Sequence, residues 1–358
     1  MKLRLHAYDL PLRHTFTISR ESITSQPSLI VELEHGGHRG YGETTANRYY
    51  GFTIESMAQA LAALESEVAA AADALVQDPA RFWDRFALHL KDNAFALCAL
   101  DQAAYDLWGK LRGQKVHEIW QESDPAALSG RAALPASNYT QGIDKIDVMV
   151  AKLAEFPDWP IYKIKLGTDR DIEIVRELRK YTSATFRVDA NCGWTADQTI
   201  ANAPLLKDLG VEFIEQPLPA DKWQDYRRVC RESALPIIAD ESCIVENDVE
   251  KCAGLFHGIN IKLTKCGGLT PARRMITQAR ELGLKVMVGC MTESTVGISA
   301  IAQLLPLLDY VDMDGAVLLA KDIADGARVI RGICRYSAEN GNGVRLLEEG
   351  RNPLESAP

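Results

Sequence analysis

The chain has 358 residues, 47% of them hydrophobic and 25% charged, which is enough for one large domain with a sizeable core and one smaller domain. Its formal net charge is −9, so it offers no generally basic surface, and we expect neither nucleic acid nor a membrane among its partners. Eight cysteines lie singly without a C-x-x-C pair, and the N-terminus begins with a strand-like pattern instead of an apolar signal segment. These features indicate a cytoplasmic protein with reduced thiols.

The N-terminal part of the chain predicts an α+β unit. Three alternating runs predict an antiparallel meander, with strands at 3–10, 28–34 and 39–43. The long polar stretch 14–26 between the first two strands is expected to form a lid loop, because loops of this length in compact domains are often functional. Helical patterns then run from residue 53 to about 76 and from 79 to about 107. We assign residues 1–115 to this capping domain.

From residue 133 onward, strand-like and helical patterns alternate. The strand-like runs lie at 134–139, 161–165, 185–189, 211–215, 236–240, 259–263, 285–289 and 310–314. Eight strands that alternate with helices predict a parallel (β/α)8 barrel of the TIM type. We assign this barrel to residues 116–326 and expect the tail, 327–358, to return to the capping domain and complete it.

Three carboxylates follow apolar runs at the ends of successive predicted strands: Asp189, Glu215 and Asp240. The carboxyl ends of barrel strands meet at one face, so these side chains should lie together. Carboxylates a few ångströms apart raise one another's pKa unless a cation neutralises them. Oxygen ligands from three strands suit Mg²⁺, and we therefore predict one Mg²⁺ per subunit at this position.

Lysines occupy two further strand ends. Lys163 and Lys165 alternate with Ile164, so both face the same way, and their repulsion is expected to lower the pKa of Lys165 and make it a general base. Lys262 ends the sixth predicted strand, opposite Lys165, whereas Lys265 is predicted to be a turn residue beyond that strand. Two bases on opposite faces of a metal-bound carboxylate predict 1,1-proton transfer, that is, racemisation or epimerisation.

Five motifs together resemble the enolase superfamily, in its muconate-lactonizing-enzyme subgroup. They are Lys163-Ile164-Lys165, Asp189-Ala190-Asn191, Glu215-Gln216-Pro217, Ala239-Asp240-Glu241-Ser242 and Asn260-Ile261-Lys262-Leu263. The resemblance covers nearly the whole chain. Segments 262–268, 289–294 and 312–315 look like those of the dipeptide epimerases. This resemblance implies a Mg²⁺-stabilised enediolate at the C-terminal residue of an L-Ala-L-Xaa dipeptide, with Lys163, Lys165 and Lys262 as catalytic lysines.

The resemblance also implies how the dipeptide is held. Asp312 and Asp314 would grip its ammonium group, and Met291 and Thr292 would contact the substrate. Well-known members of the family act on L-Ala-D/L-Glu through a lid arginine, which Arg20 would supply here as a bidentate carboxylate clamp. Arg48 is a competing anion binder, and Glu21 beside Arg20 would favour a neutral or cationic side chain instead. A homo-oligomer and a role in peptidoglycan peptide recycling are likewise implied by the family.

Other functions remain open from the sequence. The same strand ends could serve an o-succinylbenzoate synthase or a muconate cycloisomerase, in which one lysine acts as base or stabilises a cation. The Asp312 and Asp314 pair discriminates against both, because their substrates carry no ammonium group. A Schiff-base aldolase would have little use for three carboxylates, and a catalytically silent peptide-binding barrel would not need the full set of charged strand ends.

Overall fold

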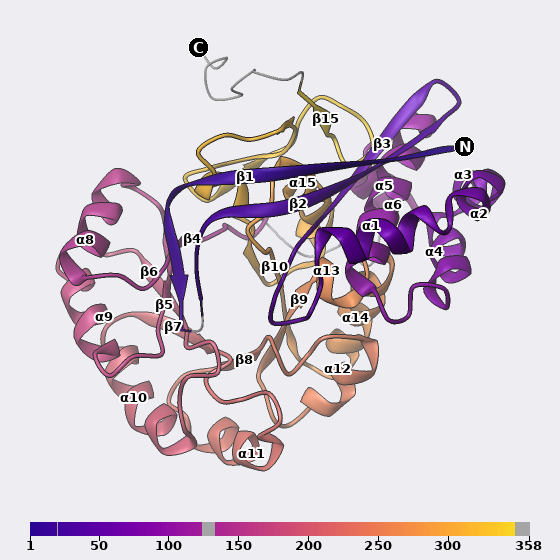
Figure 1. Ribbon diagram of the computed structural model, residues 1–358. Coiled ribbons are helices and arrows are strands. Elements are labelled where there is room, and N and C mark those ends of the chain that lie inside the picture. Colours follow the sequence, from indigo (N-terminus) through magenta and orange to yellow (C-terminus); the bar gives the residue numbers. More distant parts are fainter. Residues whose placement is uncertain (20, 124–132, 348–358) are drawn as a thin grey trace.

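The computed structural model describes residues 1–19, 21–123 and 133–347, and its main body is a barrel of eight parallel strands (Figure 1). The strands are β4 (Tyr139–Gln141), β5 (Ile161–Lys165), β6 (Thr185–Asp189), β7 (Val211–Glu215), β8 (Ile237–Ala239), β9 (Gly258–Lys262), β10 (Lys285–Gly289) and β11 (Tyr310–Asp312). They lie side by side in chain order, and a parallel bridge between Ser137 and Val311 joins the first end of the sheet to the last. The predicted (β/α)8 fold is therefore confirmed.

Helices cover the outside of the barrel, as Figure 1 shows for α8 to α12. They are α8 (Ile146–Glu155), α9 (Asp171–Arg179), α10 (Ala196–Asp208), α11 (Trp223–Glu232), α12 (Glu246–Cys252), α13 (Leu263–Cys266), α14 (Leu269–Glu281) and α15 (Thr295–Leu304). Strand residues such as Ile164, Val188 and Ile214 are fully buried, because parallel strands are covered on both faces. No described helix is long and apolar enough to cross a membrane.

The N-terminal sheet is larger than expected, and the predicted lid loop at 14–26 is wrong. β1 (Lys2–Ile18), β2 (Glu21–His35) and β3 (His38–Thr45) form an antiparallel sheet, and the first two strands continue as a hairpin through that stretch. Phe16 pairs with Ile23, and Ile18 pairs with Glu21. Alternating Phe16, Ile18 and Ile23 can pair as strands, which the many polar residues around them concealed.

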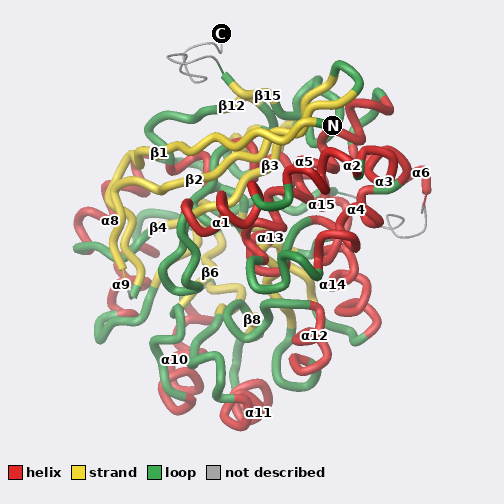
Figure 2. Tube along the Cα trace, turned by 45° about the vertical axis from the view of Figure 1, so that its right-hand side comes forward, coloured by secondary structure: helices red, strands yellow, loops and turns green. Residues whose placement is uncertain are grey.

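The end of this hairpin rests on the barrel. Figures 1 and 2 show the β1–β2 hairpin running across one end of the barrel and bending down over the strand ends. The Ile143 amide donates a hydrogen bond of 2.8 Å to the Thr17 carbonyl, and the Ser19 hydroxyl donates one of 3.3 Å to the Asn191 carbonyl. The capping domain therefore contributes directly to the mouth of the barrel.

The helices of the capping domain are shorter than predicted. The stretch 53–76 forms α1 (Ile54–Ala62), α2 (Glu65–Ala70) and α3 (Ala72–Gln77), and the stretch 79–107 forms α4 (Pro79–Ala87) and most of α5 (Ala94–Arg112). The helical conformation breaks at Leu64 and Ala71, and the Asn93 side chain starts α5 by accepting the Ala96 amide. The expected connector after residue 113 contains a further helix, α6 (Val116–Ser123).

Helix α5 joins the cap sheet, the barrel and the tail. Asp101 of α5 accepts hydrogen bonds of 2.9 Å from both the amide and the hydroxyl of Thr270, near the start of α14. The Asn342 amide donates to Asp106, and Lys110 donates to the Val344 carbonyl, so the tail contacts the cap. The domain boundaries 1–115, 116–326 and 327–358 stay a prediction.

The tail itself is made of short strands. β12 (Ala324–Asp325) pairs with β15 (Arg345–Leu346), and β13 (Arg328–Ile330) pairs with β14 (Ile333–Arg335). After β11, the only covering element before this tail in the described chain is a 3-10 turn, η2 (Gly315–Leu318). In the described chain, the last barrel strand is therefore not followed by a long helix.

The packing of β3 on α5 leads to a stability prediction. A Cβ atom at Gly42 would lie 2.0 Å from the Ala99 carbonyl oxygen, so Gly42→Ala must push β3 from α5 and should lower the free energy of unfolding by about 3 kcal/mol. Gly37→Ala is the matched control, since its Cβ meets nothing within 4 Å and only its φ of 79° costs about 1 kcal/mol. Urea unfolding measures the free energy of unfolding of both variants. Equal losses in the two would contradict the close packing of β3 on α5.

Candidate active site

The register of the parallel strands places the candidate site residues at one level. Lys165 on β5 aligns with Asp189 on β6, which aligns with Glu215 on β7. On the other side of the barrel, Lys262 on β9 aligns with Gly289 on β10, which aligns with Asp312 on β11. The strands β6, β7 and β8 separate β5 from β9, and β4, β11 and β10 separate them the other way. Lys165 and Lys262 therefore lie on opposite walls.

The three predicted metal ligands lie together. One carboxylate oxygen from each of Asp189, Glu215 and Asp240 lies within 4.8 Å of the other two, and all three side chains are buried. Burial, followed by the charge of Asp189, raises the pKa of Glu215 to about 7. Hard oxygen donors that repel one another in a buried cluster are the donor set that suits Mg²⁺, so these residues fit the expected cation.

Gln216 holds the turns that carry two of these carboxylates. It follows Glu215 directly and adopts a φ of 35°, an unusual backbone conformation for a residue other than glycine. Its side-chain oxygen accepts the Asp240 amide at 2.8 Å and the Ser242 amide at 3.1 Å, and its nitrogen donates to the Ser242 hydroxyl. The ends of β7 and β8 are thus fixed to each other.

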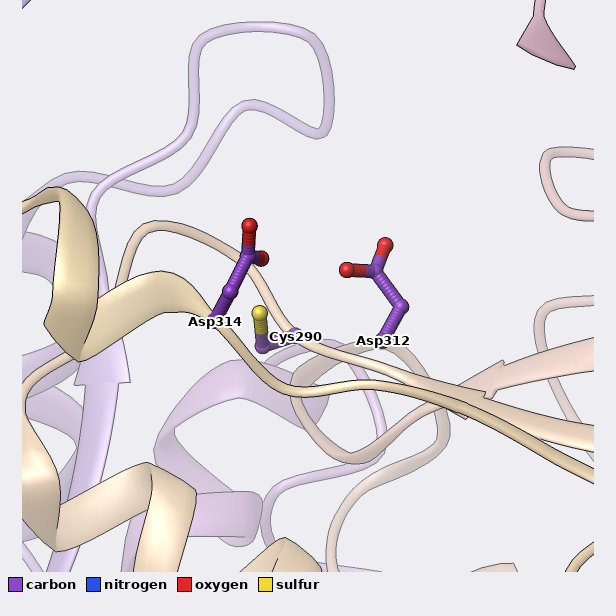
Figure 3. A group of neighbouring side chains, drawn as sticks. All are labelled: Cys290, Asp312 and Asp314. Atoms are coloured by element: carbon purple, nitrogen blue, oxygen red, sulfur yellow. The ribbon is translucent and has the colours of Figure 1, made fainter. Parts of the chain in front are cut away.

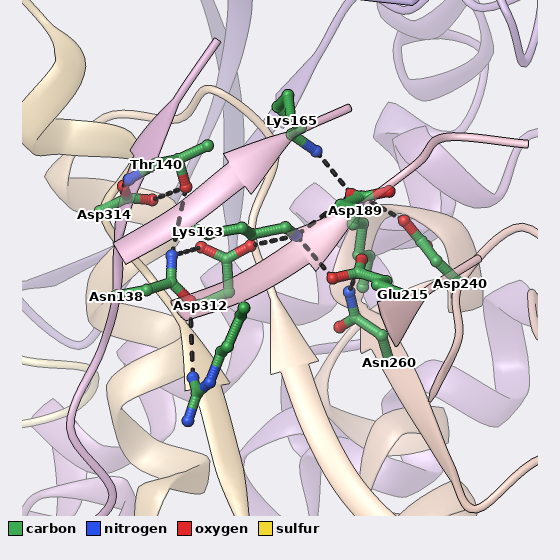
Figure 4. A network of polar contacts seen from close by, with 12 residues as sticks. Asn138, Thr140, Lys163, Lys165, Asp189, Glu215, Asp240, Asn260, Asp312 and Asp314 are labelled. Atoms are coloured by element: carbon green, nitrogen blue, oxygen red, sulfur yellow. Dashed lines mark hydrogen bonds and ion pairs between the residues drawn. The ribbon is translucent and has the colours of Figure 1, made fainter. Parts of the chain in front are cut away.

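Lys163 lies at the centre of the charged groups (Figure 4). Its ammonium nitrogen is 2.7 Å from Glu215, 2.8 Å from Asp312 and 3.3 Å from Asp189. Burial lowers the pKa of Lys163, but the attraction of Asp312, Glu215 and Asp189 outweighs burial and raises this pKa well above its usual value. Lys163 therefore joins the carboxylate cluster to the eighth strand as a permanent cation.

The two candidate bases contact different carboxylates. Lys165 lies 2.6 Å from an oxygen of Asp189, and Lys262 lies 2.9 Å from an oxygen of Asp240. Burial lowers the pKa of Lys262, but the charge of Asp240 outweighs burial, so the net shift is upward. Buried carboxylates therefore raise the pKa of both Lys163 and Lys262. The role of Lys165 as a general base stays a prediction.

The sequence predicted that Lys265 is a turn residue, and this prediction is wrong. It lies in the one-turn helix α13, its side chain is completely buried, and its nitrogen is 2.5 Å from an oxygen of Asp240. It also donates to the carbonyls of Asp240 at 2.6 Å and Cys243 at 3.2 Å. These three contacts use all the protons of the ammonium group. Lys262, which lines the pocket described below, remains the better candidate for a base.

Asp312 and Asp314 lie beside this cluster with both carboxylates on the same side and the Cys290 sulfur between them (Figure 3). Asn138 donates a hydrogen bond of 2.8 Å to Asp312, and the Thr140 amide and hydroxyl donate to Asp314. Burial, followed by the charge of Asp312, raises the pKa of Asp314 well above its usual value. Lys163 already pairs with Asp312. One further positive charge would therefore balance the second carboxylate of the pair.

A pocket brings these groups together with the capping domain. The barrel contributes Lys163, Lys165, Lys262, Asp312 and Asp314, and also Thr140, Asn191, Cys290, Met291, Thr292 and Leu318. The cap contributes Phe16, Ile18, Glu21, Ile23, Gln26, Asn47, Tyr49 and Tyr50. The predicted Met291 and Thr292 thus line the pocket. The sequence did not identify most of these cap residues as pocket residues, because apolar side chains form no recognisable charged motif.

Of the two candidate anion binders, one can be located. Arg20 lies outside the described residues. Arg48 is exposed and is not among the described residues that line the pocket. The carboxylate of Glu21 does line it.

Comparisons with known proteins place the chain in a family. Residues 148–350 match the enolase C-terminal domain-like model, and residues 2–120 match the mandelate racemase and muconate lactonizing enzyme N-terminal domain. An L-Ala-D/L-amino acid epimerase of Flavobacterium johnsoniae is 56% identical over 97% of this chain and 100% of its own length. An L-Ala-D/L-Glu epimerase of Bacteroides thetaiotaomicron is 39% identical over 97% of this chain and 88% of its own length.

The fold is also similar to that of solved structures. A dipeptide epimerase from Methylococcus capsulatus, complexed with Mg and the dipeptide L-Arg-D-Lys, superimposes with a TM-score of 0.82 at 31% identity, over 96% of this chain and 99% of that one. The capped barrel and its charged strand ends define an isomerase of the racemase and epimerase kind. The chain belongs to the mandelate racemase and muconate lactonizing enzyme family of the enolase superfamily.

The carboxylate cluster predicts a stabilising cation. Mg²⁺ at about 100 times its dissociation constant should raise the free energy of unfolding by about 2.7 kcal/mol, because it binds only the folded site. In Glu215→Gln, which removes one negative ligand, the gain at the same Mg²⁺ concentration should be much smaller. Thermal unfolding with and without Mg²⁺, at ionic strength matched with NaCl, measures this difference. An equal gain in the wild type and the variant would place the cation elsewhere.

Proposed function

We propose that this protein is a Mg²⁺-dependent dipeptide epimerase that inverts the α-carbon of the C-terminal residue of an L-Ala-L-Xaa dipeptide. The observation that carries the proposal is the position of Lys165 and Lys262 on opposite strands, lining one pocket beside a buried carboxylate cluster. The names of its relatives support the same activity, since they are epimerases of L-Ala dipeptides.

The residues of the chain divide the reaction between them. Lys165 removes the α-proton from one face, and Lys262 delivers a proton to the opposite face; the reverse reaction exchanges these roles. Asp189, Glu215 and Asp240 would hold Mg²⁺, which would supply positive charge beside the negative charge that develops on the substrate as its α-proton leaves. Lys163 keeps its charge and helps to hold the substrate carboxylate beside these ligands. All of these groups are preorganised by the strand register, so little rearrangement is needed.

The ammonium group of the dipeptide would bind beside the two aspartates at the end of the eighth strand. Asp312 and Asp314 present two buried carboxylates on one side, and Asp314 lacks a cation of its own among the ion pairs of the described residues. A bound ammonium would stabilise the charged form of Asp314. A substrate of an o-succinylbenzoate synthase or a muconate cycloisomerase brings no such charge, so the pair favours the epimerase.

The side chain of Xaa would meet the capping domain. Phe16, Ile18 and Ile23 of the hairpin give this wall an apolar character, and Glu21 adds one carboxylate. We therefore propose a broad set of Xaa side chains, glutamate among them, in which Arg20 would bind the glutamate carboxylate. Arg20 as side-chain reader, the homo-oligomer, the cytoplasmic location and the role in peptidoglycan peptide recycling stay predictions from the resemblance.

Single lysine variants test the two-base reaction. Lys165→Met and Lys262→Met should each lower epimerisation by about 10²–10⁴-fold, because each removes one acid–base group. In D₂O each variant should still exchange the α-proton of one configuration of the dipeptide, and the two variants should favour opposite configurations. NMR of the α-proton signals measures both effects, and Lys180→Met, at an exposed lysine, is the control. Full turnover in both variants, or exchange of the same configuration by both, would contradict the proposal.

A further inference from the structure

Two buried glutamates lie where the capping domain contacts the barrel, and the proposed reaction does not use them. Glu43 on β3 is completely buried, and its carboxylate accepts hydrogen bonds from the Ser28 hydroxyl, the Ser294 amide and hydroxyl, and the Gly297 amide. Two of these donors are backbone amides at the start of α15, where a negative charge is favoured by the helix dipole. Glu43 therefore takes up the donors at this helix end.

Glu293, directly before Ser294, has far fewer partners. Its side chain is 2% exposed, and one carboxyl oxygen accepts the Met291 amide at 2.7 Å. The other oxygen has no hydrogen-bond partner among the described residues. This oxygen lies against Gly297, where an added Cβ would approach it to 2.1 Å. A carboxylate with one donor, beside a second buried carboxylate, would be an uncompensated charge.

The charged and titratable groups around Glu293 come from several elements. Glu43 lies on β3, Lys262 on β9, Cys98 on α5 and Cys290 in the loop after β10. Burial, followed by the charge of Glu43, raises the pKa of Glu293 to about 8, although the Met291 amide and Lys262 oppose the shift. This shift favours the neutral carboxylic acid form of Glu293 at pH 7.

The segment that Glu293 holds is a wall of the substrate pocket. Cys290, Met291 and Thr292 all line the pocket. Gly315 packs against the same segment so closely that an added Cβ would lie 2.7 Å from the Met291 carbonyl oxygen. Gly315 follows Asp314, so the wall contacts both Glu293 and the chain beside the candidate ammonium site.

We propose that Glu293, as a neutral acid, is a positioning residue that fixes the pocket wall 290–292 through its hydrogen bond to the Met291 amide. This inference rests on the proposed function, because it concerns how the dipeptide is bound. Ionisation of Glu293 places a second buried negative charge beside Glu43 and pushes the wall out of place. Dipeptide binding should therefore weaken as the pH rises through about 8, the pKa of Glu293.

The test is the pH dependence of KM for an L-Ala-L-Xaa dipeptide in four forms of the Mg²⁺-loaded enzyme. In the wild type, KM should rise above pH 8. The α-amino group of the dipeptide also loses its proton at about pH 8 and contributes equally to the rise in every form. Glu293→Gln keeps the acceptor for Met291 and carries no charge, so it should keep KM at pH 7 and show a smaller alkaline rise, that of the substrate alone. Glu293→Ala should raise KM by about 10–100-fold with a smaller change in kcat, because the Met291 amide loses its partner. In Glu43→Gln the rise should begin at lower pH, since a neighbouring negative charge is removed.

An infrared difference spectrum between the wild type and Glu293→Gln, without substrate at pH 7, tests the protonation separately. It should show one carbonyl band of a protonated carboxyl on the wild-type side, because the bands of other protonated carboxyls, such as Asp314, are common to both proteins and cancel. An unchanged alkaline rise of KM in Glu293→Gln, or the absence of that band, would overturn the inference while leaving the epimerase intact. Failure of the wild type to turn over any L-Ala dipeptide would instead refute the proposed function, and the infrared spectrum would still decide the state of Glu293.

Discussion

The ion pairs of Lys163 are the interaction on which the rest of the site depends. Three carboxylates from β6, β7 and β11 approach one buried ammonium group within 3.3 Å. Without this cation, Asp312 would add a further negative charge to the cluster of Asp189 and Glu215, and burial would force several of these groups to take up protons. Lys163 thus connects the candidate metal site to the candidate ammonium site, so a substrate with a carboxylate and an ammonium group can bridge both.

The barrel and the capping domain contribute different groups to the site. The barrel holds the charged groups on strand ends whose register is set by backbone hydrogen bonds, which is the precision that proton transfer at a carbon atom requires. The cap supplies Phe16, Ile18 and Glu21 on a hairpin that is separate from the strands carrying the acid–base groups. Substrate selectivity can therefore change in the cap without disturbing the acid–base groups, in agreement with the different dipeptides in the names of the relatives.

Much of this arrangement could be predicted from the sequence, because strand ends carry their own signal. β5, β6, β7 and β10 begin and end where expected, and the positions of Lys163, Lys165, Asp189 and Glu215 follow from that periodicity. β8 and β11 end before Asp240 and Asp314, which were expected to lie within them. The sequence could not show that Lys265 reaches back to Asp240, since this contact depends on the one-turn helix α13. Nor could it show that carboxylates outweigh lysine repulsion at Lys163, which depends on distances across the barrel. The β1–β2 hairpin was mistaken for a loop because many polar residues surround Phe16, Ile18 and Ile23 and conceal the strand pattern.

The central claim is that the dipeptide α-carbon is inverted between two walls of the barrel. The most direct measurement is to incubate the wild-type protein with Mg²⁺ and a mixed L-Ala-L-Xaa library in D₂O and to follow the products by NMR and mass spectrometry. The account predicts one deuterium per molecule, at the α-carbon of the C-terminal residue only, together with the L,D diastereomer. Absence of deuterium from every dipeptide, or inversion that retains the original proton, would contradict it.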